Sequence, residues 1–357
     1  MKVLITGGAG FVGANLAIAI KENYPESRVT SLDNLYRKGS ELNLQRLAKH
    51  GVRFLKGDVR SKRDIESAGE ADFLIECSAE PSVLAGKDGG VDYLVGTNLY
   101  GAVNCAEFCR KNGSTMIFLS TSRVYPIKPL LECEIRKGRR RFDFADRQKI
   151  SGLSAYGVSE DFPMQGVRSL YGATKYAAET MLIDYADAFK FNLLINRFGV
   201  IAGPWQFGKS DQGIAPFWLA SHMFRKKIKY IGFGGTGRQV RDFLHIDDAV
   251  KLILMQMRKP AKFAINNSKG MPFNVGGGKE NSASLLELTD LCRGITGQKI
   301  EIGSELETRY ADIPVYISDS RKIISLCGWK PRKNIKNILS DIHEWIKNTP
   351  SAQKIFG

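Results

Sequence analysis

The sequence predicts an α/β fold with a doubly wound parallel sheet and a smaller C-terminal domain. Short apolar segments alternate with helix-like segments through the first half of the chain, which is typical of parallel strands joined by helical crossovers. A glycine-rich turn directly follows the first apolar segment. With 357 residues and 43% hydrophobic content, the chain can form one large core or two modest ones.

The first strand is predicted at residues 1–6 and is followed by Gly7, Gly10 and Gly13, with a helix over about residues 11–22. Glycines in such a turn permit a tight bend, bring backbone N–H groups close to a pyrophosphate and let the helix pack against the strand. The N-terminus of the helix also favours phosphate. This strand–turn–helix order predicts a Rossmann-type dinucleotide site.

A second strand, predicted at residues 28–32, ends at Asp33, twenty residues after Gly13. A carboxylate in this position can bind both ribose hydroxyls of NAD, and it would repel the additional phosphate of NADP. Arg37 and Lys38 lie close by, but the acid favours NAD. The alternative is that Asp33 only caps a loop.

Polar and small residues follow the third and fourth predicted strands, which lie at residues 52–56 and within residues 73–79. Because ligands bind at the carboxyl ends of parallel strands, we expect these residues to border the nucleotide. Asn98 opens a helix predicted at residues 99–111. It serves either the nucleotide or the helix as a cap.

Three residues have the chemistry to deprotonate an alcohol. Tyr171 and Lys175 are four residues apart on one predicted helix, so they share a face, and a nearby cation favours the phenolate of a tyrosine. A phenolate can act as a general base towards an alcohol. Thr121 ends a fifth strand, predicted at residues 116–121, where its hydroxyl can bind the same oxygen. A solvated helix face and a turn-capping hydroxyl are the alternatives.

The residues predicted to contact the cofactor are Gly7, Gly10, Phe11, Val12, Gly13, Asp33, Asn34, Asp58, Val59, Ser78, Ala79, Asn98, Tyr171 and Lys175.

The segment 6–13, together with Asp33, Thr121, Tyr171 and Lys175, resembles the extended short-chain dehydrogenase/reductase superfamily over nearly the whole chain. Within it, the NAD-dependent nucleotide-sugar epimerases look most similar. The resemblance implies bound NAD, a nucleotide-sugar substrate, and a homodimer or homotetramer formed through helices at residues 99–111 and 171–189.

The second half of the chain is most similar to the CDP-paratose 2-epimerases, also called CDP-tyvelose 2-epimerases. The similarity lies in Gln206, Asp211, Gln212 and residues 237–242. The resemblance implies that Arg238 and Arg241 grip the substrate pyrophosphate, a role that suits the planar guanidinium. The residues it implies for substrate binding are Arg123, Asn196, Gln206, Gln212, Arg238, Arg241 and Arg309.

The implied activity is epimerisation of CDP-paratose to CDP-tyvelose at carbon 2, through a keto sugar. The residues themselves indicate only hydride transfer from an alcohol, so a UDP-hexose 4-epimerase remains an alternative, as does a non-catalytic dinucleotide sensor. A 4,6-dehydratase needs an acid directly after the strand-end threonine. Here Ser122 and Arg123 follow Thr121, which disfavours that reaction.

The expected domains are a NAD-binding domain at residues 1–199 with 240–258, and a nucleotide-sugar-binding domain at residues 200–239 with 259–345. The segment 126–168 is longer than the resemblance implies and is rich in basic residues. We expect it to lie over the sugar.

The formal net charge is +15, with a dense basic run at residues 136–141. A solvated basic loop is the first interpretation of this run, and steering of an anionic nucleotide-sugar is the second. No nucleic-acid-binding motif accompanies it, so no nucleic-acid partner is expected. The six cysteines lack metal-ligand spacing, so no metal is expected. No apolar run spans a bilayer and no signal peptide precedes the first strand, so we expect a cytoplasmic protein without a membrane partner.

Overall fold

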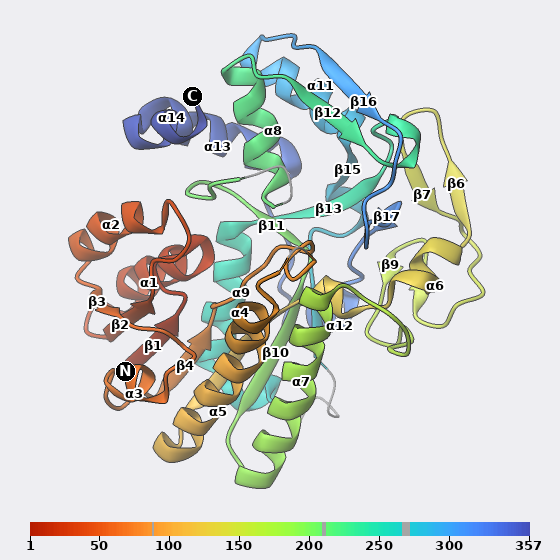
Figure 1. Cartoon of the computed structure of the whole chain (residues 1–357). Helices are drawn as coiled ribbons and strands as arrows, with labels where there is room; N and C mark the ends of the chain where they lie inside the picture. Colours follow the sequence, from red (N-terminus) through yellow and green to blue (C-terminus); the bar gives the residue numbers. More distant parts are fainter. Residues whose placement is uncertain (88, 209–211, 266–271) are drawn as a thin grey trace. The chain divides into compact units, whose positions relative to one another are not determined.

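The computed structural model describes residues 1–87, 89–208, 212–265 and 272–357 (Figure 1). The chain divides into two compact units. The first comprises Met1–Thr121, Leu170–Arg197 and Val250–Pro272, and the second comprises Ser122–Ser169, Phe198–Ala249 and Phe273–Gly357.

The main sheet has seven strands in the order β14–β10–β5–β4–β1–β2–β3. Strands β2 and β3 extend the sheet to one side of β1, and later strands extend it to the other, which is the doubly wound arrangement. Strands β1 to β5 pair in parallel, and the predicted fold class is confirmed. The strands are β1 Lys2–Thr6, β2 Arg28–Asp33, β3 Arg53–Lys56, β4 Phe73–Glu76, β5 Thr115–Thr121, β10 Leu193–Phe198 and β14 Phe273–Val275.

One face of this sheet packs on two long helices of the first unit, α5 and α7, which lie side by side in Figure 1. Leu4, Leu74, Met116 and Leu193 contribute to the core on this face, because alternate residues of a strand point to the same side. The helices of the unit are α1 Phe11–Asn23, η1 Ser40–Leu42, α2 Asn43–Lys49, α3 Lys62–Glu66, α4 Val91–Val95, η2 Gly96–Tyr100, α5 Gly101–Asn112, α7 Leu170–Phe189 and α10 Pro260–Phe263.

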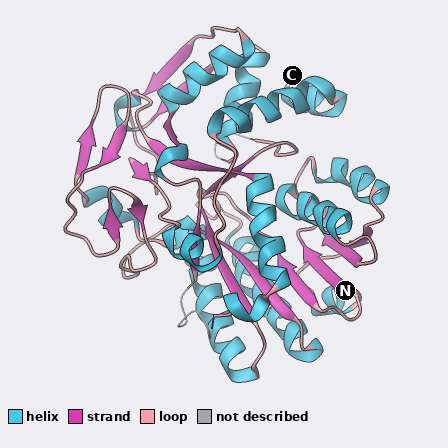
Figure 2. Cartoon of the chain, turned by 180° about the vertical axis from the view of Figure 1, so that it is seen from behind, coloured by secondary structure: helices cyan, strands magenta, loops and turns pink. Residues whose placement is uncertain are grey.

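The second unit has its own core, in which Trp218, Leu288, Ile342 and Trp345 are buried. Its small sheets appear in magenta in Figure 2. The strands are β11 Val200–Ala202, β13 Val240–His245, β15 Ser282–Ser284 and β17 Val315–Tyr316 in one sheet, β12 Ile228–Ile231 with β16 Ile302–Glu305, β6 Ile135–Lys137 with β7 Phe142–Phe144, and β8 Leu153–Ser154 with β9 Gly157–Val158.

The helices of the second unit are η3 Ser122–Val124, α6 Ile127–Glu132, α8 Ile214–Met223, η4 Phe233–Gly235, η5 Lys279–Asn281, α11 Leu285–Thr296, α12 Arg321–Cys327, α13 Ile335–Asn348 and α14 Pro350–Phe356. Reciprocal hydrogen bonds between Ser284 and Glu287 begin α11, and this capping box satisfies backbone N–H groups of its first turn. The remaining helix is α9, Ile246–Arg258. Its first residues, up to Ala249, belong to the second unit, and the rest belong to the first.

The unit boundaries differ from the predicted domains in several places. Residues 122–169 belong to the second unit, because their strands bond there: Phe142 N–H donates to the Arg238 carbonyl at 2.9 Å and Val158 N–H to the Ile317 carbonyl at 2.8 Å. Residues 198–199 and 240–249 also belong to the second unit, and residues 259–265 belong to the first. These boundaries cannot be read from local sequence patterns, because they follow from contacts between distant segments.

No helix among the described residues is long and apolar enough to cross a membrane.

Candidate active site

The glycine turn after β1 is packed too tightly for side chains. An added Cβ at Gly8 would lie 2.6 Å from a side-chain carbon of β2, and one at Gly13 would lie 2.3 Å from the carbonyl oxygen of Gly7. Gly7 also has a φ of +63°, which favours glycine. The turn therefore presents backbone without side chains next to the N-terminus of α1, where Phe11 and Val12 begin the helix. This arrangement fits a dinucleotide pyrophosphate.

Asp33 ends β2 beside this turn. Its Oδ2 accepts a hydrogen bond from Ala9 N–H at 3.1 Å, and its Oδ1 accepts one from Leu35 N–H at 2.8 Å. Burial raises the pKa of the Asp33 carboxyl, and these backbone donors oppose that effect. Because each carboxylate oxygen can accept two hydrogen bonds, Asp33 can still accept hydrogen bonds from ribose hydroxyls.

Asn34 and Asp58 meet after the ends of β2 and β3. Asn34 Nδ2 donates to Asp58 Oδ2 at 2.9 Å, and Arg60 donates to the same carboxylate at 2.7 and 3.0 Å. Burial acts to raise the pKa of Asp58, but these hydrogen bonds outweigh it and lower the pKa to about 2. Val59 is buried behind this pair, and its carbonyl accepts a hydrogen bond from Asn104.

Ser78 has a buried hydroxyl without a hydrogen-bond partner in the described part of the chain. A buried polar atom without a partner calls for an explanation, and a bound nucleotide beside Ser78 and Ala79 would supply one. Asn98 does not open its helix as predicted, because the helical run begins earlier and Asn98 lies inside the π-turn η2. Its amide donates to Thr174 Oγ1 of α7 at 3.1 Å and accepts from Glu80 N–H at 2.8 Å. Such π-turns often occur at functional sites.

The three residues predicted to act on an alcohol all lie in the first unit. Thr121 is the last residue of β5, and Tyr171 and Lys175 occupy successive turns of α7, which packs against β5. Thr121 and Tyr171 are each 8% exposed, and Lys175 is 1% exposed. Burial holds these side chains in defined positions, as proton transfer at a fixed atom requires.

Glu76 was not identified from the sequence, yet it contacts Lys175. The Lys175 Nζ lies 3.4 Å from Glu76 Oε2 and 3.8 Å from the centroid of the Phe118 ring. Burial raises the pKa of the Glu76 carboxyl, and the charge of Lys175 opposes that effect. The signal in the sequence was a single acid at the end of an otherwise apolar strand.

A second buried ion pair anchors the same helix. Arg197 of β10 donates to the Glu179 carboxylate of α7 through Nε at 3.0 Å and through Nη2 at 2.7 Å. Ser120 Oγ donates to the same carboxylate at 2.5 Å. Because Ser120 directly precedes Thr121, this cluster holds the helix that carries Lys175 against the strand that ends at Thr121.

In the second unit, predicted substrate contacts gather around one turn. Arg241 Nη2 donates to Asp312 Oδ1 at 2.8 Å, and Arg123 Nη1 donates to the Ala311 carbonyl at 3.2 Å. Arg309 begins this turn, since its carbonyl accepts from Asp312 N–H. Burial lowers the pKa of Arg241 to about 10, and Asp312 opposes that effect. Two guanidinium groups at one turn suit phosphate recognition.

Arg238 has different neighbours, which come from the basic segment. Its guanidinium carbon lies 5.0 Å from the ring centroid of Phe142, and its Nη1 donates to the Gly138 carbonyl at 3.4 Å. Its Nε donates to Thr236 Oγ1 at 3.2 Å. The hairpin β6–β7 therefore holds Arg238 by a cation–π contact and a backbone carbonyl.

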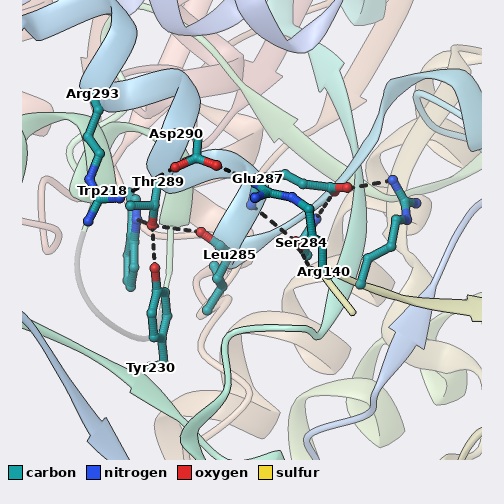
Figure 3. Close-up of polar contacts among 10 residues, drawn as sticks. Arg140, Trp218, Tyr230, Ser284, Leu285, Glu287, Thr289, Asp290 and Arg293 are labelled. Atoms are coloured by element: carbon teal, nitrogen blue, oxygen red, sulfur yellow. Dashed lines mark hydrogen bonds and ion pairs between the residues drawn. The ribbon is translucent and has the colours of Figure 1, made fainter. Parts of the chain in front are cut away.

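Part of the basic run packs against α11 rather than lying free in solvent. Arg140 forms an ion pair with Asp290, and Arg141 Nη1 lies 3.2 Å from Glu287 Oε2. Figure 3 shows Arg140 beside the first turns of α11, where Ser284 Oγ donates to the Arg140 carbonyl at 2.9 Å. These contacts give the run a structural role in the second unit in addition to its charge.

The three predicted amide contacts have separate environments. Gln206 donates through Nε2 to a backbone carbonyl at 3.1 Å, and its Oε1 is buried without a partner among the described residues. Gln212 lies just before α8, and Asp211 lies outside the described residues. Asn196 is fully buried and exchanges hydrogen bonds of 2.8 and 2.9 Å with Gln256. This reciprocal pairing gives Asn196 a role in the interior of the first unit.

Both the sequence and the fold are similar to those of known proteins. The model of a family described as NAD dependent epimerase/dehydratase matches residues 3–276. CDP-paratose 2-epimerase of Salmonella typhi is 29% identical over 97% of this chain and 99% of that protein. A putative UDP-glucose 4-epimerase of Methanocaldococcus jannaschii is 28% identical over 97% of this chain and 98% of that protein. The crystal structure of UDP-glucose 4-epimerase from Thermotoga maritima with UDP-glucose has a TM-score of 0.77 at 23% identity, over 97% of this chain and 99% of that chain, and so shares the fold.

Proposed function

The chain belongs to the NAD-dependent epimerase/dehydratase family, and from this premise we propose that it converts CDP-paratose to CDP-tyvelose at sugar carbon 2. The proposed route is oxidation to a keto sugar, followed by return of the hydride to the opposite face of the same carbon. The family is NAD-dependent, so the cofactor predicted from the glycine turn and Asp33 is confirmed.

The proposed roles rest on the chemistry of each side chain and on the resemblance to the family. Tyr171 accepts the proton of the sugar hydroxyl, and Thr121 hydrogen-bonds the same oxygen. NAD, when bound at the glycine turn, supplies the acceptor for the hydride that leaves the carbon. Lys175 lies one turn from Tyr171 and would contact the cofactor when NAD is bound. Arg241 binds the pyrophosphate of the substrate, because a guanidinium matches its oxygens in a bidentate way.

One observation carries the choice of sugar and carbon. The chain is similar to CDP-paratose 2-epimerase from end to end, at 29% identity over 97% of its length. The catalytic residues alone do not select carbon 2, because the carbon oxidised depends on how the sugar is oriented.

The second candidate is a UDP-hexose 4-epimerase, since the Methanocaldococcus jannaschii relative that carries that description is 28% identical. A 4,6-dehydratase is disfavoured, because no carboxylate follows Thr121: Ser122 and Arg123 occupy the next turn, and Arg123 donates to a backbone carbonyl at 3.2 Å. A non-catalytic sensor is disfavoured because the chain has both Tyr171 and Lys175.

Proton NMR of the purified protein with separate nucleotide-sugars, and without added NAD, tests this proposal. We expect CDP-paratose to give its carbon-2 epimer without added NAD, because each cycle regenerates the oxidised cofactor, which can therefore remain bound to the purified protein. Conversion of UDP-glucose to UDP-galactose, with CDP-paratose unchanged, would support the 4-epimerase instead. No conversion of either sugar, even after NAD is supplied, would contradict both enzymatic proposals.

The proposal includes a cytoplasmic homodimer or homotetramer. Large apolar side chains are exposed on η2 and α7, with Tyr100 at 62%, Met181 at 42% and Phe189 at 49%. Exposed apolar side chains that gather on neighbouring helices favour association with a second copy.

A further inference from the structure

Tyr36 presents a large aromatic ring that the proposed mechanism does not use. It lies in the loop between β2 and η1 and is 67% exposed. A second ring nevertheless holds it in place: the ring of Tyr93 on α4 lies beside it, with the centroids 4.4 Å apart and the planes tilted by 34°. An exposed aromatic side chain that another ring supports is suited to binding a flat ligand by stacking.

The backbone before Tyr36 turns sharply to bring its ring to this place. Leu35 has a φ of +59°, in the left-handed region that residues other than glycine seldom adopt. The N–H of Leu35 donates to Asp33 Oδ1 at 2.8 Å, and the N–H of Tyr36 donates to Asn34 Oδ1 at 3.0 Å. The carboxylate that was predicted to bind the ribose therefore also fixes the turn that carries Tyr36. Strained backbone of this kind is concentrated at ligand sites.

Tyr93 is itself held by a cation. The guanidinium carbon of Arg60 lies 4.7 Å from the centroid of the Tyr93 ring, which is a cation–π contact. Arg60 also forms an ion pair with Asp58, at 2.7 Å between Nη2 and Oδ2, and Asp58 accepts a hydrogen bond from Asn34 at 2.9 Å. The loop after β2, the loop after β3 and α4 thus support the two rings together.

The order of the strands puts these rings at the adenosine end of a bound dinucleotide. The pyrophosphate fits the glycine turn after β1, and Asp33 ends β2, where it can bind the ribose. Strand β3 lies on the far side of β2 from β1. A base attached to that ribose therefore extends from the end of β2 towards the loop after β3, which Arg60 connects to Tyr93.

We propose that the ring of Tyr36 stacks on the adenine of NAD, and that Tyr93 is the positioning residue that holds the ring of Tyr36 for this contact. Adenine offers a flat π face, and stacking on an aromatic side chain requires no hydrogen bond to the base. Asp33 and Tyr36 then act on neighbouring parts of one ligand, the carboxylate on the ribose hydroxyls and the ring on the base. The inference concerns the cofactor alone, so it holds whichever nucleotide-sugar is the substrate.

Calorimetric titration of the cofactor-free protein with ADP-ribose tests the proposal, because this ligand has the adenosine and pyrophosphate of NAD without the nicotinamide. We expect Tyr36→Ala to raise the Kd about tenfold, as expected for the loss of one stacked ring from a base. Tyr36→Phe keeps the ring, so its Kd should stay within about twofold of the parent. Because Tyr36 is exposed, both variants should fold like the parent.

Tyr93→Ala separates positioning from a merely structural role. Alone it should raise the Kd about threefold, because the ring of Tyr36 loses the neighbour that holds it. The double variant Tyr36→Ala/Tyr93→Ala should bind ADP-ribose as Tyr36→Ala does, because Tyr93 acts through Tyr36. Losses that add in the double variant would overturn the role of Tyr93.

A Kd for Tyr36→Ala within about twofold of the parent would overturn the stacking contact itself, and would leave Tyr36 as an exposed ring with another partner. If the Tyr93 variants do not fold, Tyr36→Ala and Tyr36→Phe still decide the contact with adenine. ADP-ribose is neither the sugar substrate nor a hydride acceptor, so a wrong assignment of the sugar or of the reaction would not change these affinities.

Discussion

Replacement of Tyr171 with phenylalanine should lower kcat by about 10²–10⁴-fold, the range expected for loss of a general acid–base group. The substitution removes only the phenolic oxygen, so the buried ring remains on the first turn of α7, where it is 8% exposed. Steady-state turnover of the nucleotide-sugar measures the effect. The KM should change little, because the proposed anchor of the nucleotide is Arg241.

The matched control is Tyr100→Phe, which removes the same atom from an exposed side chain of the first unit, 62% accessible. We expect this variant to keep full activity. A Tyr171→Phe protein that turns over within a few-fold of the parent would remove Tyr171 from the mechanism and revive the interpretation of the chain as a dinucleotide sensor.

Replacement of Arg197 with methionine should destabilise the first unit by about 3–5 kcal/mol, because it leaves the Glu179 carboxylate buried without its cation. Both side chains are nearly inaccessible, at 6% for Arg197 and 1% for Glu179. Urea denaturation followed by circular dichroism measures the free energy of unfolding. The double variant Arg197→Met/Glu179→Leu should recover much of the loss, because it removes both charges.

Arg110 of α5 offers a comparison in solvent. It also makes a bidentate contact with a carboxylate, that of Glu107, with hydrogen bonds of 2.7 and 2.9 Å, but the two side chains are 37% and 22% exposed. The Arg110→Met variant should therefore cost about 1 kcal/mol or less. Equal costs for Arg197→Met and Arg110→Met would show that the buried cluster does not anchor α7.

The ends of the parallel strands could be predicted closely, because they combine apolar runs with glycine or acid at fixed offsets. Residues 28–32 followed by Asp33 correspond to β2, Arg28–Asp33, and the helix expected from Tyr171 corresponds to α7, Leu170–Phe189. The start of the helix that contains Asn98 was predicted too late. A π-turn continues α4 into α5, and nothing in the local composition of residues 91–98 marks this continuation.

Contacts between distant segments could not be predicted from the sequence. The pairing of Glu76 with Lys175 joins residues 99 positions apart, and the pairing of Arg241 with Asp312 joins residues 71 positions apart. Periodicity reports which face of an element is apolar, but it does not report which charge meets which. For the same reason the packing of the hairpin β6–β7 beside Arg238 and α11 within the second unit could not be predicted from the sequence.

The candidate site likewise contains residues that the local sequence could predict and residues whose contacts needed the structure. The glycine turn, Asp33, Thr121 and Tyr171 could be proposed from the sequence because each has a chemical reason tied to a strand end or a helix face. Asn196 was proposed from resemblance, and its reciprocal hydrogen bonds with Gln256 in the interior could be seen only in three dimensions.

Inversion is proposed to proceed by removal and return of the substrate's own hydrogen as hydride. Running the reaction in deuterium oxide and recording the proton NMR spectrum of the epimerised product tests this step. The inverted carbon should keep its original hydrogen, because hydride held on the cofactor does not exchange with solvent. Deuterium at the inverted carbon would instead indicate inversion by removal and return of a proton and would overturn the proposed mechanism.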